Sequence, residues 1–151
     1  MNHSIAINKE EALYNLNHPS RDVYTREEAV RQLAEDPTHA DLLRLAQALE
    51  DQQFGVRWEA AVQLANLGDE ALPPLLHILV TQHESTWLRE GAHHVCYYSR
   101  SARVRSETQA LQKALRGPAA EVAAADAAVK LLRTWDESAP ANVEVSHPEN
   151  A

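Results

Sequence analysis

The stretch DQQFGVRWEAAVQLANLGDEALPPLLHIL, residues 51–79, decides the fold, because its spaced pattern returns about 31 residues upstream and about 32 residues downstream. The segment Arg57-Trp58-Glu59-Ala60 aligns with residues 26–29 and 89–92. Repetition at this period is typical of helical units that stack and bury their apolar faces against their neighbours. The sequence therefore predicts an all-α fold, a short α-α superhelix of three to four helical hairpins.

The composition of the 151-residue chain also favours a helical domain. The apolar fraction is 44%, with one phenylalanine and four glycines, which suits packed helices better than pleated sheet. The formal charge of −8 disfavours binding to nucleic acid or to an anionic membrane, since phosphates would be repelled. The only cysteine, Cys96, excludes an internal disulfide and suits a reducing compartment. Neither a membrane span nor a signal peptide is evident, so we expect a cytoplasmic protein.

Helix start and stop signals divide the chain into three parts. Residues 1–20 are expected to form a capping segment, with Asn8 as a helix cap and Pro19 in the break after it. Residues 21–135 hold the repeats. The first helices of the hairpins are expected over about 21–35, 55–67 and 85–98. Of the second helices, one is expected over 38–51, the next begins at residue 69 and the third ends at residue 116, and a final helix is expected over 119–135. Residues 136–151 are polar and lack periodicity, which predicts a disordered tail.

The run from Val56-Arg57 through Ala60-Ala61 to Leu67-Gly68-Asp69 resembles HEAT repeats, in particular the phycobilisome-lyase-like HEAT subfamily. The resemblance covers roughly residues 20–135 and implies a fold more than an activity, because the matching residues are the packing ones. It further implies that each recurring arginine pairs with an acid in the preceding turn. The expected pairs are Asp22 with Arg26, Asp51 with Arg57, and Glu84 with Arg89.

Trp58 is the first candidate for a binding role, because the equivalent positions in the neighbouring repeats hold Glu27 and Glu90. An exposed aromatic at this place would anchor an interface. The alternative is that its indole folds over the repeat junction and covers Val56 or Val62.

The one basic stretch of the chain runs from residue 100 to residue 116 and contains Glu107 as its only acid. Such a stretch either binds an acidic partner or forms a solvated face. We place Arg44, Gln47, His77, Gln109 and Lys113 on second helices that face a concave groove. The candidate partner-binding residues are Trp58, His77, Arg103, Arg105, Gln109 and Lys113.

Metal-capable side chains are densest at His93, His94 and Cys96. Two ligands three residues apart do not complete a zinc site, and no nucleophile elbow or phosphate loop is present. We expect His93 to pack and to bond to a carbonyl or to a neighbouring tyrosine, and Cys96 to be a small core residue. The sequence predicts no catalytic residue, no metal and no cofactor.

The leading functional hypothesis is a non-enzymatic protein–protein interaction module, an adaptor or scaffold that binds a partner in its concave groove. The resemblance implies an alternative, a bilin lyase-like or chromophore-protein chaperone factor centred on residues 93–98. Nucleic-acid binding by residues 100–116 is disfavoured by the acidic charge. The alanine-rich final helix needs cover from the tail or from a second copy, which raises a homodimer as a further prediction.

Overall fold

The computed structural model describes the backbone of residues 8–82 and 84–146 and the side chains as far as residue 135, and every regular element in these ranges is helical. The elements are α1 (Lys9–Asn17), α2 (Val23–Leu33), α3 (His39–Gln47), η2 (Ala48–Glu50), α4 (Phe54–Leu67), η3 (Gly68–Ala71), α5 (Leu72–Thr81), α6 (Thr86–Tyr98), α7 (Ala102–Glu107), α8 (Gln109–Arg116) and α9 (Ala120–Ser146). The predicted all-α solenoid is confirmed.

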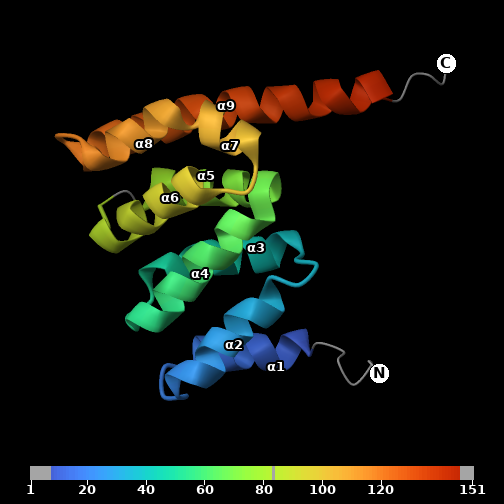
Figure 1. The fold of residues 1–151 in the computed structure, drawn as a ribbon, viewed down its shortest axis with the longest axis vertical. Coiled ribbons are helices and arrows are strands. Elements are labelled where there is room, and N and C mark those ends of the chain that lie inside the picture. The colour runs from blue at the N-terminus through green and yellow to red at the C-terminus, as the bar shows by residue number, and fades with distance from the viewer. Residues whose placement is uncertain (1–7, 83, 147–151) are drawn as a thin grey trace.

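The helices stack in two layers (Figure 1). In the first layer α2, α4, α6 and α8 follow one another, and in the second layer α3, α5 and α9 do the same. Helix α1 covers α2 at one end of the stack, and α9 closes the other end by packing against α5 and α8. Each helix therefore buries its apolar face against sequential neighbours, as in other solenoids.

Polar side chains fix the starts of several helices. Asn8 accepts from the backbone of Glu11 at 3.0 Å, which confirms the predicted cap of α1. Thr38 and Asp41 form a reciprocal capping box at the start of α3. Ser85 and Ser101 accept from the backbone three residues later and so begin α6 and α7. These caps satisfy amide groups that have no partner inside the helix.

The core is a continuous band of leucine and alanine between the two layers. Leu45, Leu64, Leu75 and Leu88 are completely buried. Burial of such a side chain contributes about 1.5 to 3 kcal/mol relative to leaving it in water. The turn between α4 and α5 depends on Gly68, whose φ of 72° is strained for any residue with a side chain.

The third predicted hairpin differs from expectation. The helix expected up to residue 116 is interrupted at Thr108, whose buried hydroxyl donates to the Val104 carbonyl at 2.6 Å and so ends α7. Arg100 donates its backbone N–H to the Ala65 carbonyl at 2.9 Å, which ties the preceding turn to the end of α4. Helix α8 then packs on α6 in the first layer, and α9 takes the place beside α5.

Helix α9 is longer than the sequence predicts. Its backbone continues as a helix to Ser146, residues 147–151 lie outside the described part, and the disorder expected for residues 136–151 stays a prediction. Trp135 is only 5% exposed and anchors α9 against the stack. Extension of an anchored helix adds one hydrogen bond for each residue ordered.

The outer face of α9 carries charged side chains beside the exposed Val122 and Val129. Ala124 and Ala128 are buried, whereas Asp126 and Lys130 are exposed and form an ion pair at 3.2 Å. Cover by a second copy stays a prediction. Among the described helices, none combines the length and apolarity required to cross a bilayer.

Candidate functional site

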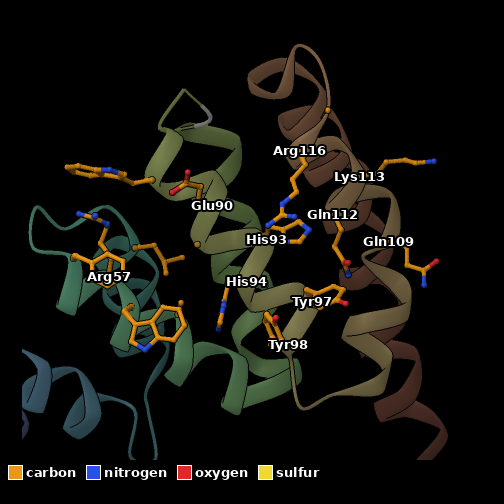
Figure 2. Close-up of a pocket in the computed structure, with 17 residues that line it drawn as sticks. Arg57, Glu90, His93, His94, Tyr97, Tyr98, Gln109, Gln112, Lys113 and Arg116 are labelled. Atoms are coloured by element: carbon orange, nitrogen blue, oxygen red, sulfur yellow. The ribbon is translucent and has the colours of Figure 1, made fainter.

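A groove of about 980 Å³ opens along the first layer, between α4, α6 and α8. Figure 2 shows that α6 is the central helix of the groove, with His93, His94, Tyr97 and Tyr98 along it. Lining residues of α8 are Gln109, Gln112, Lys113 and Arg116, and those of α4 are Phe54, Arg57, Trp58 and Ala61. Three consecutive helices of one layer therefore contribute to a single surface.

Gly91 sets how closely α6 approaches the preceding repeat. A Cβ atom at this position would lie 2.9 Å from Cδ2 of Leu49, a residue of η2 that is 1% exposed. The aligned positions in the two earlier repeats hold Glu28 and Glu59. The absence of a side chain thus lets α6 lie directly on η2 and places the histidines and tyrosines of α6 beside α4.

Aromatic rings of α4 and α6 form a continuous series, which we call the aromatic chain: Phe54, Trp58, His94, Tyr98 and Tyr97. Successive ring centroids are separated by 6.3, 5.1, 4.7 and 4.9 Å. Trp58 is 50% exposed and Tyr98 is 63% exposed. Of the two alternatives for Trp58, the structure shows the exposed one.

Arg57 and Trp87 extend the aromatic chain toward the start of α6. The guanidinium carbon of Arg57 lies 4.0 Å from the Trp87 ring centroid, which is a cation–π contact. The same guanidinium donates to the backbone carbonyl of Asp51 at 2.8 Å. Arg57 is therefore held in place by its own repeat, and it carries its charge to the edge of the groove.

The expected pairing of each arginine with the acid of the preceding turn is wrong for Arg26. The carboxylate of Asp22 instead accepts from the hydroxyl of Thr25 at 2.6 Å and caps α2. Arg26 binds the carboxylate of Asp51 in the following turn, through two hydrogen bonds of 2.8 and 2.7 Å. Arg26 pairs with the acid of the following turn because Asp22 already serves as the N-cap of α2.

Lys113 and Arg116 bring positive charge to the α8 side of the groove. Both side chains are exposed, and within the described residues neither makes a hydrogen bond or an ion pair. Glu90 is the only carboxylate among the residues that line the groove. The two cations are thus available to an incoming group.

The histidines of the groove favour their neutral forms. Burial lowers the pKa of His93 below its ordinary value, and the nearby charge of Arg116 and then His94 lower it further. Burial also lowers the pKa of His94. His93 stacks on Tyr97 with ring centroids 5.8 Å apart, but within the described residues it makes no hydrogen bond to a carbonyl or to a tyrosine, which had been expected. At neutral pH the charges in the groove are therefore those of arginine, lysine and Glu90.

The structure brings together only half of the predicted partner-binding residues. Trp58, Gln109 and Lys113 line the groove. His77 is exposed on α5 in the other layer. Arg103 lies with its guanidinium carbon 3.7 Å from the Trp135 ring centroid, and Arg105 donates to the Ser99 carbonyl at 2.5 Å.

The groove between α4, α6 and α8 lies in the first layer, and partner binding on the second helices stays a prediction. Arg44 donates to the side chain of Asn17 at 2.8 Å, and like Gln47 it does not line the groove. Gln109 and Lys113 reach the groove only because α8 joins the first layer.

The predicted partner-binding set did not include Phe54, Trp87, His94, Tyr98 or Arg116, although the alternative centred on residues 93–98 and the basic stretch 100–116 contained three of them. Spacing contained part of the signal, because Phe54 with Trp58 and His94 with Tyr98 are each four residues apart and share a helix face. The contact between these two pairs depends on the packing of α4 against α6 and carries no signal in the sequence.

Cys96 lies in the core and not in the groove. Its side chain is completely buried, which confirms the predicted packing role, and burial raises the pKa of the thiol to about 12. In the part of the chain that the structure describes, no three side chains of His, Cys, Asp or Glu converge to hold a metal. The thiol is neither accessible nor ionised at neutral pH.

Comparison with known protein families gives a match. The family model described as HEAT repeats matches residues 10–94, which extend from α1 into α6 and cover more than half of the chain. No curated protein and no solved structure gives a significant match.

Proposed function

This chain belongs to the HEAT-repeat family, and we propose that it is a non-enzymatic protein–protein interaction module that holds a partner in the groove between α4, α6 and α8. The aromatic chain is the observation that carries the proposal. Tryptophan and tyrosine are enriched among the residues that contribute most to protein interfaces. Exposed aromatics joined over two helices, rather than scattered singly, indicate an interaction surface.

The geometry of the groove supports an adaptor or scaffold role over catalysis. The aromatic side chains offer a large apolar area, and Gln109 on α8 adds a polar group at the opposite edge. A bound segment would bury rings that now face water, and each ring can bury about 150 to 250 Å². The free and buried thiol of Cys96 agrees with a cytoplasmic location, where thiols stay reduced.

The alternative, a bilin lyase-like or chromophore-protein chaperone factor, has less support. Such a factor requires a histidine, cysteine or tyrosine beside a carboxylate. His93 and Glu90 both line the groove and are the candidates for this pair. Cys96 is buried away from that groove and cannot form a thioether there. We therefore keep chromophore binding as an outcome of the test rather than as the proposal.

The test is affinity purification of the tagged protein from its own lysate, with mass spectrometry and visible absorption of the retained material. We expect a stoichiometric protein to bind the wild type and to be lost from the Trp58→Ala/Tyr98→Ala variant. The matched control is His77→Ala, an exposed side chain in the other layer, which should retain the partner. Circular dichroism checks that all three proteins fold.

Two outcomes would contradict the proposal. One is retention of the same proteins by the wild type, the groove variant and the control. The other is a coloured sample without a protein partner, which would favour the chromophore alternative.

A further inference from the structure

The groove has a charge opposite to that of the protein as a whole. The chain carries a formal charge of −8. The residues that line the groove include Arg57, Lys113 and Arg116 as cations and only Glu90 as an acid. A partner that approaches this acidic protein therefore meets a locally positive surface at the groove, and such surfaces select partners by charge.

Apolar and cationic groups occupy different sides of the groove. Trp58 and Phe54 come from α4, and Lys113 and Arg116 come from α8, with α6 between them (Figure 2). Arg57 belongs to the aromatic side and is already held by carbonyls and by Trp87. Within the described residues, Lys113 and Arg116 are therefore the two lining cations whose charges are still available to pair with a ligand.

We propose that the groove binds an acidic peptide segment that also carries apolar side chains. Its carboxylates meet Lys113 and Arg116 on α8, while its apolar side chains cover Trp58 and Tyr98. This inference rests on the proposed function and names the chemistry of the partner. Charge pairs at the edge of the groove set partner choice and association rate, and the buried aromatic contacts supply most of the affinity.

A single-stranded nucleic acid is the competing ligand, because it too would combine stacking with cations. The acidic charge of the chain opposes it, since the phosphates of a polymer extend beyond the groove and meet a negative surface. A short peptide places only its own carboxylates at α8 and avoids this repulsion. The observations therefore favour the peptide.

The experiment selects a phage-displayed library of random dodecapeptides against the full chain. We expect enriched sequences to combine aspartate or glutamate with aromatic or aliphatic residues. Selection against Lys113→Glu/Arg116→Glu should lose the acidic preference. Selection against Lys130→Glu/Arg133→Glu, the same charge change on the exposed face of α9, should keep it.

The most enriched peptide is then synthesised with a fluorescent label and titrated by anisotropy. Charge reversal in the groove should weaken binding about tenfold or more, and the control reversal on α9 should change it by no more than about twofold. Added salt should weaken binding to the wild type, because exposed charges are screened within about 10 Å at 0.1 M.

Each result separates the inference from the proposed function. Enriched peptides without acidic residues that still require Trp58 would overturn the acidic partner and leave the interaction module intact. The absence of any peptide that depends on Trp58 would overturn both. Binding of a labelled oligouridine that is lost with Lys113→Glu/Arg116→Glu, without enrichment of acidic peptides, would replace the peptide by a nucleic acid.

Discussion

Arg26 and Asp51 form a two-pronged ion pair in which the two terminal nitrogens of the guanidinium donate to the two carboxylate oxygens, at 2.8 and 2.7 Å. The Arg26 side chain is 2% exposed and also donates to the Leu16 carbonyl at the end of α1 and to the side chain of Gln53. One buried arginine therefore connects the capping helix, the first hairpin and the turn into α4.

Removal of one partner of this pair should destabilise the stack. Asp51→Ala leaves the guanidinium of Arg26 buried without its counter-charge, so we expect a loss of about 3 kcal/mol in the free energy of unfolding. Urea unfolding followed by circular dichroism measures it. The control is Arg31→Ala, which breaks an exposed pair with Glu59 and should change stability by less than about 1 kcal/mol. Equal losses in the two variants would refute the special role of the buried pair.

The stabilisation by Asp51 should depend on pH. Burial acts to raise the pKa of Asp51, but the hydrogen bonds from Arg26 and from the Gln53 amide outweigh it, so the pKa lies below the ordinary 3.8. In the unfolded chain the carboxylate binds protons more readily, and the stabilisation is complete above pH 3.8 and is lost as pH falls through the folded pKa. The stability difference between wild type and Asp51→Asn should therefore shrink on acidification. A difference that stays constant down to the acid transition would contradict this mechanism.

Gly91 should tolerate a side chain poorly. A Cβ atom would lie 2.9 Å from Cδ2 and 3.3 Å from Cβ of Leu49, which is buried and cannot move away freely. We expect Gly91→Val to lower the free energy of unfolding by about 2 kcal/mol through overpacking. Combining it with Leu49→Ala should destabilise less than the sum of the two single changes, because the smaller residue makes room. Strict additivity in urea unfolding would show that the two residues do not constrain each other.

The two groove histidines should respond differently to loss of Arg116. Burial lowers the pKa of both His93 and His94, so NMR titration should give midpoints below 6.5 for both rings. The charge of Arg116 lowers the pKa of His93 further but is not among the causes for His94. Arg116→Ala should raise the midpoint of His93 and leave that of His94 unchanged. A shift of both midpoints by the same amount would indicate a general rearrangement of the groove.

Local signals allowed the sequence to predict most helices. The cap at Asn8, the glycine turn at Gly68 and the start of α6 after Ser85 all depend on groups within a few residues of one another. Beyond Trp135 the backbone of α9 continues to Ser146, and the disorder expected for residues 136–151 stays a prediction.

Only part of the groove could be predicted. The unusual aromatic at Trp58 was visible because the repeats can be aligned, whereas the contact between Trp58 and His94 joins two helices that are distant in sequence. His77 was assigned to the groove because the second helices were expected to face it, whereas His77 lies on α5 and the groove lies between α4, α6 and α8.

The sequence by itself determined the helical solenoid, the spacing of its repeats and the identity of its buried leucines, because periodic apolar residues and local caps act over one or two helical turns. The tertiary structure decided which acid binds Arg26, which layer α8 joins and which side chains share the groove. Those outcomes depend on helix packing between segments about 30 residues apart in the sequence. The repeat pattern of apolar residues allows several arrangements of these segments. Steric fit at Gly91 and the use of the Asp22 carboxylate as a helix cap select one of them.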